Sequence, residues 1–145
     1  MQNERVLFLC TGNTARSQMA EAFLRKYAGE HFEAYSAGFT PSVINPYTER
    51  VMQEIGIDLS GQHSKSVKEY LGKISFTYLI TVCAEAEATC PTTFPGISHR
   101  LSWPFDDPAA GGGSEEEKLQ KFREVRDQIE KRIKLWIEEK GFSIK

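Results

Sequence analysis

A thiol and a guanidinium stand six positions apart near the beginning of the chain, as Cys10 and Arg16, and Ser17 follows directly. A cysteine thiolate is a strong nucleophile, and the planar fork of an arginine can hold two oxygens of a tetrahedral anion. Together they could bind an oxyanion and attack its central atom. The alternative is a buried cysteine that ends a strand and an arginine on a helix surface, because this spacing also arises by chance.

The elements around these residues favour the anion site. The apolar run from Val6 to Leu9 predicts a strand, and the segment from Ser17 to Ala28 has the apolar spacing of an amphipathic helix that stops near Gly29. The first amides of a helix lack intrahelical partners and carry the positive end of its dipole, so a loop wrapped over them gathers amides around an oxyanion. That field also favours thiolate, so we expect Cys10 to be reactive near neutral pH. The predicted binding loop comprises Thr11, Gly12, Asn13, Thr14, Ala15, Arg16 and Ser17.

Two further cysteines flank a segment of good helix formers. Cys83 follows a predicted third strand, Phe76 to Val82, and Cys90 comes seven residues later. A helix of that length spans about 10 Å, whereas a disulfide needs its Cα atoms within about 7 Å. The pair therefore predicts a redox switch in which the helix must unwind, although two small buried residues beside a surface turn would fit as well. We expect no metal, because the cysteine spacing is unlike that of zinc sites and neither His63 nor His99 lies in a ligand-like pattern.

An acid follows the fourth predicted strand, His99 to Trp103. Asp106 and Asp107 precede Pro108, which favours an extended conformation for the residue before it. A carboxylic acid at this edge of the sheet could protonate a departing oxygen. We assign this role to Asp107, while a simple Asp-Pro turn is the alternative.

The rest of the chain alternates between predicted strands and helices. A strand is predicted from Phe32 to Ser36, and the next helix is capped by Asn45, begins at Pro46 and ends at Gly56. A short helix is predicted from Ser66 to Leu71. The last helix runs from Glu115 to Lys140, after the Gly111–Gly113 hinge and a Ser114/Glu117 capping box. This alternation predicts a three-layer α/β fold with a four-stranded, parallel, doubly wound sheet, in one domain spanning residues 1–145. In such sheets, sites form at the carboxyl ends of the strands, where Cys10 is expected.

Composition restricts the partners. The chain has 145 residues and a formal net charge of −2, so nothing indicates nucleic acid or an acidic membrane. It contains neither an apolar run of membrane-spanning length nor a basic and then apolar N-terminus, so we expect a cytoplasmic protein, acting as a monomer. Three cysteines do not make a secreted disulfide framework.

With these motifs in view, the chain resembles the low-molecular-weight tyrosine phosphatase superfamily, whose phosphate loop has the form C-x5-R-[ST]. More closely, it resembles the thioredoxin-coupled arsenate reductases built on that fold. The loop indicates only the superfamily, whereas the added pair of cysteines is typical of the reductases. The resemblance covers nearly the whole chain and includes Ser17–Glu21, Tyr35–Gly38, Asn45–Pro46, the Cys83 and Cys90 pair, and Asp106–Ala109.

The resemblance implies a reaction sequence. Arsenate would bind in the loop, held by Arg16, and Cys10 would attack arsenic while Asp107 protonates the leaving oxygen. Cys83 would then attack Cys10, releasing arsenite and leaving a Cys10–Cys83 disulfide. Cys90 would pass the disulfide to Cys83–Cys90, and thioredoxin would reduce it by thiolate exchange. No cofactor is needed besides this reductant.

Two positions depart from the patterns of the superfamily. Some members bind potassium through residues that match Asn13, Glu21 and Ser36, together with an acid where this chain has Lys65. We therefore expect no potassium site, and an ammonium that neutralises Glu21 instead. Tyrosine phosphatases of this fold usually carry tyrosines just after the Asp-Pro, where this chain has alanines and glycines.

Two other functions remain open at this point. A phosphomonoesterase needs only the nucleophile, the arginine and the acid, so weak phosphatase activity is expected even of a reductase. An oxyanion or thiol sensor could instead signal through the helix between the two later cysteines. Such a sensor would turn over slowly and bind a partner in a redox-dependent way.

Overall fold

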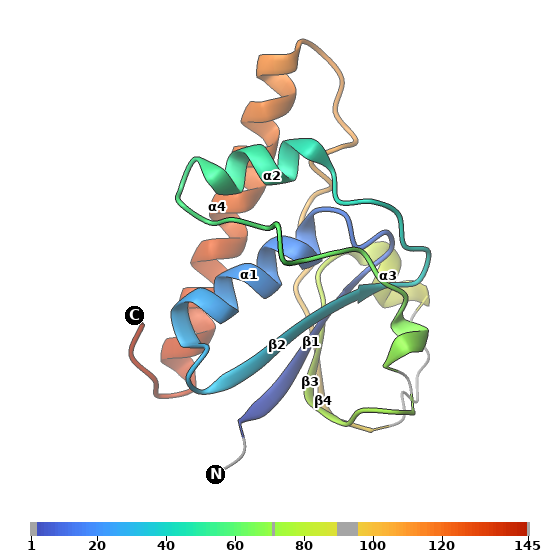
Figure 1. Cartoon of the computed structure of the whole chain (residues 1–145), viewed down its shortest axis with the longest axis vertical. Helices are drawn as coiled ribbons and strands as arrows, with labels where there is room; N and C mark the ends of the chain where they lie inside the picture. Colours follow the sequence, from blue (N-terminus) through green and yellow to red (C-terminus); the bar gives the residue numbers. More distant parts are fainter. Residues whose placement is uncertain (1–2, 71, 90–95, 145) are drawn as a thin grey trace.

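Four parallel strands form the centre of the protein in the order β2-β1-β3-β4. The computed structural model describes residues 3–70, 72–89 and 96–144. Its strands are β1 (Glu4–Cys10), β2 (Phe32–Gly38), β3 (Phe76–Thr81) and β4 (Ile97–Ser102). The predicted four-stranded parallel α/β fold is thus confirmed, with most strands slightly longer than their apolar runs (Figure 1).

The central strand β1 carries the first chemical group to the carboxyl edge of the sheet. Its residues from Val6 onward are buried, as expected of a strand covered on both faces. In the parallel register Cys10 lies beside Gly38 of β2, and Leu9 lies beside Thr81 of β3. Cys10 therefore lies between the ends of two neighbouring strands.

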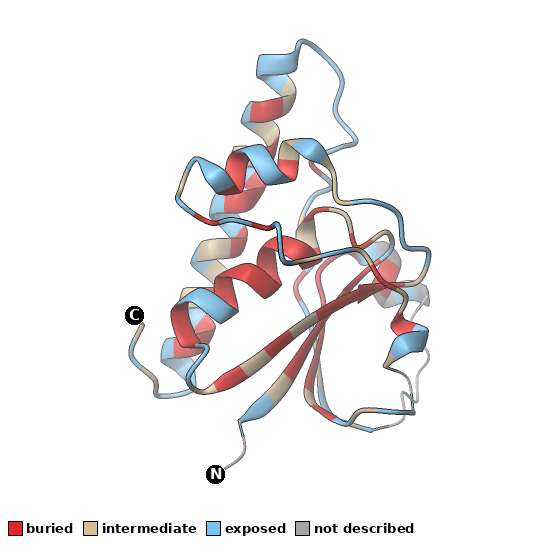
Figure 2. Ribbon diagram, viewed as in Figure 1, coloured by how far each residue is buried: buried red, intermediate tan, exposed pale blue. Residues whose placement is uncertain are grey.

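Helices cover one face of this sheet, and Figure 2 shows buried residues along α1 and the central strands. Helices α1 (Arg16–Ala28) and α4 (Glu115–Glu139) share the larger apolar cluster with β1 and β3, and α2 (Pro46–Gln53) contributes to it. A smaller cluster on the other face includes a residue of the 3₁₀ helix η1 (Val67–Glu69). The short helix α3 (Ala84–Thr89) follows β3 at the edge where the strands end (Figure 1).

Helix boundaries follow from local chemistry. The Asn45 side chain accepts a hydrogen bond from the Tyr47 amide at the start of α2, and Ser114 forms the predicted capping box before α4. The predicted short helix is instead the 3₁₀ turn η1, capped by Ser66. Gly29 ends α1 with a φ of −62°, so this stop does not use a left-handed glycine.

The longest helix, α4, buries one stripe and exposes a charged face. Its buried apolar side chains are Leu119, Phe122, Val125, Ile129, Ile133, Trp136 and Ile137. Among the described residues, no helix combines the length and the apolar character needed to cross a membrane.

Candidate active site

The loop between β1 and α1 begins at a buried sulfur. Cys10 is the last residue of β1 and is 3% exposed, residues 11–15 form the loop, and α1 begins at Arg16. Within the described chain, Asn13 is the one non-glycine residue with positive φ, at 53°. Asparagine tolerates this left-handed conformation better than most residues, so the loop can turn sharply around the sulfur.

Two groups of the loop contact the sulfur. The Asn13 amide donates to Cys10 Sγ over 3.2 Å, and Ser17 Oγ lies 3.0 Å from the same atom. Ser17 Oγ also accepts from Asn13 Nδ2 at 2.8 Å, which leaves the hydroxyl proton free to point at the sulfur. Both groups can therefore donate a hydrogen bond to the sulfur, and hydrogen bonds to a charged acceptor are the stronger ones.

The other loop amides are available to an anion. Across the ranges that the structure describes, the amides of Gly12, Thr14, Ala15, Arg16 and Ser17 donate to no protein acceptor. No side chain caps the N-terminus of α1 either. A helix start with free amides beneath a wrapped loop is a binding site for an oxyanion.

Arg16 connects the loop to the segment that carries the predicted acid. Its Nη1 donates to the Phe105 carbonyl over 2.9 Å. The Phe105 amide donates in turn to the Val82 carbonyl at 3.1 Å, next to Cys83. These bonds bring the guanidinium, the second cysteine and the start of the acidic segment to one place.

The two acids of this segment differ in their contacts. Asp106 lies 3.5 Å from the ammonium of Lys121 on α4. Asp107 is exposed, and its Oδ1 accepts from the Ala109 amide at 2.9 Å as in an Asx turn. Among the described contacts, Asp107 makes none with Cys10 or Arg16, so its role remains a prediction.

The second cysteine is fully buried against the loop. Cys83 Sγ accepts from the Ala86 amide at 3.4 Å and lies 3.9 Å from Thr11 Oγ1. Burial raises the pKa of the Cys83 thiol, opposed by the Ala86 amide and by the nearby charge of Arg16. Cys10 and Cys83 are both free thiols. The helix predicted between the later cysteines is present as α3, while Cys90 lies outside the described residues.

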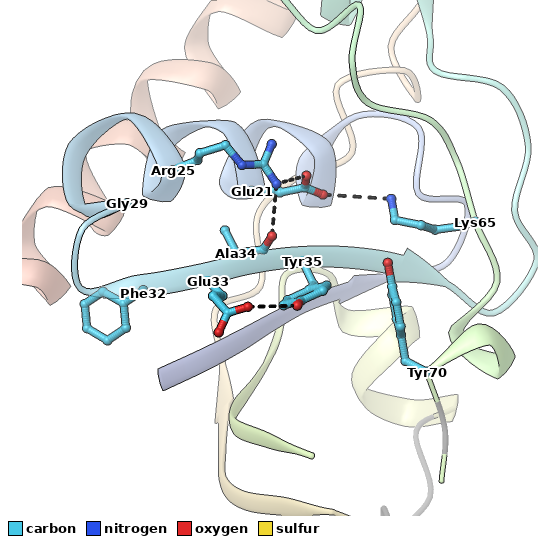
Figure 3. Close-up of a pocket in the computed structure, with 9 residues that line it drawn as sticks. All are labelled: Glu21, Arg25, Gly29, Phe32, Glu33, Ala34, Tyr35, Lys65 and Tyr70. Carbon is cyan, nitrogen blue, oxygen red and sulfur yellow. Dashed lines mark hydrogen bonds and ion pairs between the residues drawn. The ribbon is translucent and has the colours of Figure 1, made fainter. Parts of the chain in front are cut away.

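A buried carboxylate lies behind the loop, beside a cavity of about 450 Å³ that Figure 3 shows. Glu21 Oε1 accepts from Ser36 Oγ at 2.6 Å, and Ser36 Oγ accepts from Asn13 Nδ2 at 3.0 Å. Arg25 Nη2 lies 2.6 Å from Glu21 Oε2, and Lys65 Nζ lies 3.9 Å from Glu21 Oε1. Desolvation by burial lowers the pKa of Lys65.

One polar side chain at the loop was missed by reasoning from the sequence. Gln18 is fully buried, and its Nε2 donates to the carbonyl and the side-chain oxygen of Asn13, at 3.1 and 2.9 Å. It also donates to the His63 carbonyl at 3.0 Å. The sequence signals for it were a polar residue among the buried positions of a helix and its place in the Ser17–Glu21 segment of the resemblance.

The model of the low molecular weight phosphotyrosine protein phosphatase family matches residues 5–141. The chain belongs to this family. The match contains the loop from Cys10 to Ser17 and every strand of the sheet except the first residue of β1.

Within the family, the similar proteins include arsenate reductases. The arsenate reductase of Halalkalibacterium halodurans is 45% identical over 139 residues, and that of Bacillus subtilis is 42% identical over 139 residues; each match covers 95% of this chain and 98% of the relative. A solved arsenate reductase in a phosphate-binding state is 28% identical, with a TM-score of 0.75 over 94% of this chain and 98% of that one. The thioredoxin-dependent arsenate reductase of Corynebacterium glutamicum is 30% identical, with a TM-score of 0.61 over 92% of this chain and 63% of that one.

Proposed function

We propose that this protein reduces arsenate to arsenite, with Cys10 as the nucleophile and thioredoxin as the source of electrons. The second buried thiol carries the proposal, because Cys83 lies against the loop that begins at Cys10, 3.9 Å from Thr11 Oγ1. Reduction of arsenic needs two electrons, which a pair of thiols supplies, whereas ester hydrolysis needs no second thiol. The arsenate reductases among the relatives, matched over nearly their full length, support the same assignment.

In the first step, Cys10 thiolate attacks arsenic. A sulfur–arsenic bond forms and an arsenic–oxygen bond breaks, and the oxygen leaves as water with a proton from Asp107. The remaining N–H groups of Arg16 and the free loop amides stabilise the charge on the other oxygens. Asp107 reaches the oxygen by rotating from its Asx turn, for which its exposed position leaves room.

In the second step, Cys83 attacks the sulfur of Cys10. A disulfide forms and the sulfur–arsenic bond breaks, so its electron pair remains on arsenic, which leaves as arsenite. The attack needs a thiolate, although burial raises the pKa of Cys83. The Ala86 amide and the charge of Arg16 act in the opposite direction and stabilise that thiolate.

In the last step, the disulfide moves to where a reductase can reach it. Cys90 thiolate attacks Cys83, which frees Cys10 and leaves a Cys83–Cys90 disulfide. A helix as short as α3 is marginal by itself, so unwinding it costs little. Thioredoxin then reduces the bond through a mixed disulfide.

Phosphomonoester hydrolysis is the second candidate, and family membership favours it as a side activity. Its first step uses the same nucleophile, arginine and acid. The segment after Asp107 offers no aromatic wall for a phosphotyrosine ring, because Ala109 and Ala110 are exposed small residues there. We therefore expect weak hydrolysis of small aryl phosphates.

The deciding experiment measures NADPH consumption on addition of arsenate to the protein with thioredoxin and thioredoxin reductase. We expect turnover by the wild type and none by Cys83→Ser, while both hydrolyse an aryl phosphate at similar rates. Cys90→Ser should stop after one turnover with a Cys10–Cys83 disulfide, visible by mass spectrometry. Aryl phosphate hydrolysis without any arsenate-dependent turnover would identify a phosphatase instead, and arsenate binding without either activity would identify a sensor.

A further inference from the structure

Each backbone carbonyl of the loop between β1 and α1, residues 11–15, accepts a hydrogen bond from another part of the chain. Three of the donors are backbone amides of one distant segment. Thr40 N donates to Thr11 O at 2.8 Å, and Ser42 N donates to Gly12 O at 3.1 Å. A third amide, that of Asn45, donates to the Thr14 carbonyl, also at 3.1 Å. We call residues 40–45 the positioning segment.

The two remaining loop carbonyls are held by other elements. Asn13 O accepts from Ser64 Oγ at 2.7 Å and from Gln18 Nε2, and Ala15 O accepts from Met19 N at 2.9 Å. All five carbonyls from residue 11 to residue 15 are therefore satisfied on the outside of the loop. This is the pairing that buried backbone groups require.

Outward carbonyls force the amides inward. In a planar trans peptide the carbonyl and the following N–H point in opposite directions. The Gly12 carbonyl is held by the positioning segment, and the N–H of the same peptide, on Asn13, points to Cys10 Sγ at 3.2 Å. By the same geometry, the peptides after Thr11 and Thr14 present the Gly12 and Ala15 amides to the interior.

We propose that residues 40–45 are the positioning element of the active site, which keeps the loop amides aimed at the oxyanion before it binds. Thr40, Ser42 and Asn45 are positioning residues through their backbone N–H groups, with no contact to the substrate. This inference rests on the proposed function only in that the loop binds an oxyanion. Preorganised amides bind an anion without first reorienting, and that raises affinity.

The sequence of the positioning segment fits this role. Pro41 lies within the segment and Pro46 directly follows it. Neither proline has an N–H to donate, and each stands directly beside a donor to the loop. Because proline restricts φ, these residues stiffen the segment without removing a bond. Thr40 and Ser42 are exposed, so their side chains are not needed for the contact.

The end of β2 explains why the segment can lie so close to the loop. A Cβ on Gly38 would lie 2.6 Å from Thr11 O and 2.9 Å from Asn13 N, both backbone atoms that cannot yield easily. Glycine at this position therefore lets the chain leave β2 against the loop, and the donor at Thr40 follows two residues later.

The test compares Ser42→Pro, which deletes one donated N–H, with Ser42→Ala, which keeps it. The readout is protection of Cys10 by inorganic phosphate against iodoacetamide, followed on the tryptic peptide Val6–Arg16, which contains no other cysteine. We expect the apparent Kd for phosphate to rise about 10-fold or more in Ser42→Pro, because release of the Gly12 carbonyl lets the loop peptides turn and misaligns the N–H groups that bind the charged anion. Ser42→Ala should match the wild type, and thermal midpoints show whether the fold is intact.

The outcomes separate the two proposals. If phosphate does not protect the wild type, the loop binds no oxyanion, and the proposed function fails with it. If phosphate protects the wild type and Ser42→Pro equally, the positioning role is refuted while the proposed function stands. Should Ser42→Pro not fold, Pro41→Gly keeps every donor and loosens the segment, which predicts about 2- to 5-fold weaker protection; unchanged protection in that variant also refutes the positioning role.

Discussion

Removing the hydroxyl of Ser17 should change how the reactivity of Cys10 depends on pH. Ser17 is fully buried, and its Oγ lies 3.0 Å from Cys10 Sγ while accepting from Asn13 Nδ2 at 2.8 Å. A thiolate has no proton to give, so the hydroxyl must be the donor when Cys10 acts as a nucleophile, and this bond is lost when the hydroxyl is removed. Ser17→Ala deletes this bond without adding bulk, and Ser17→Thr is the matched control because it keeps a hydroxyl.

The magnitude follows from the strength of a hydrogen bond to a charged group. About 1.5–3 kcal/mol of lost stabilisation lowers the thiolate fraction about 10- to 150-fold at pH values where the thiol predominates. The less stabilised thiolate is also more nucleophilic, with a Brønsted slope of about 0.4–0.5, which restores nearly half of the loss on a logarithmic scale. The net result in mildly acidic buffer is alkylation roughly 4- to 15-fold slower. At alkaline pH, where Cys10 is ionised in both the wild type and the variant, the variant should react roughly 3- to 10-fold faster.

The assay is the second-order rate of iodoacetamide alkylation of Cys10, measured across pH on the tryptic peptide Val6–Arg16. The crossing of the two pH–rate curves is the signature, since simple damage to the loop would shift all rates in one direction. Ser17→Thr should follow the wild type within a few-fold. Curves for Ser17→Ala and the wild type that coincide, or that never cross, would refute the assigned bond.

Three further predictions concern groups around this loop. Asp107→Asn should lower both arsenate reduction and aryl phosphate hydrolysis about 10²- to 10⁴-fold, whereas Asp106→Asn, which loses only a surface pair with a lysine of α4, should stay within about twofold; equal losses would contradict the assignment. Arsenate turnover should be the same in potassium and sodium salts at equal ionic strength, because the Lys65 ammonium lies 3.9 Å from the buried carboxylate, and a potassium-specific increase would overturn this expectation. Since burial raises the pKa of Cys83 above its unfolded value, its contribution to stability is complete below the ordinary thiol pKa and is lost as pH rises toward the folded value. In urea titrations, the free energy of unfolding of the wild type should therefore fall more steeply with pH through that alkaline range than that of Cys83→Ala. Identical pH slopes for the two proteins would exclude the effect.

Much of the fold was predictable because its signals are local. The apolar run ending at Cys10 and the amphipathic segment beginning near Ser17 lie next to each other in the chain, so the strand, loop and helix required no knowledge of distant residues. The long helix α4 was equally predictable, because its capping box at Ser114 and the helical spacing of its apolar residues lie in consecutive turns of one segment. Strand ends differ from the predicted ones by one or two residues. Backbone pairing with a neighbour extends β2 to Gly38, whereas β3 and β4 each end one residue before the predicted position.

The contacts that shape the site were harder to predict from the sequence. Every residue except proline carries a backbone N–H, so nothing in the side chains of Thr40 or Ser42 indicates that their amides hold the loop. Gln18 and Ser64 reach the Asn13 carbonyl from different parts of the chain. Gln18 lies in the Ser17–Glu21 segment of the resemblance, but that segment does not show which atoms its side chain contacts. Such partners depend on how β2 and the following segments pass the loop.

The sequence by itself determined the chemical groups and their local frame: a thiol at the end of a buried strand, an arginine at the start of a helix, and five residues between them. These features depend on interactions within a few residues, namely apolar periodicity and helix start signals. The tertiary structure alone decided that Cys83 lies against Thr11 and which way the loop peptides face. The physical reason is that these contacts join residues far apart in the chain, and only the packing of the sheet and its connections brings them together.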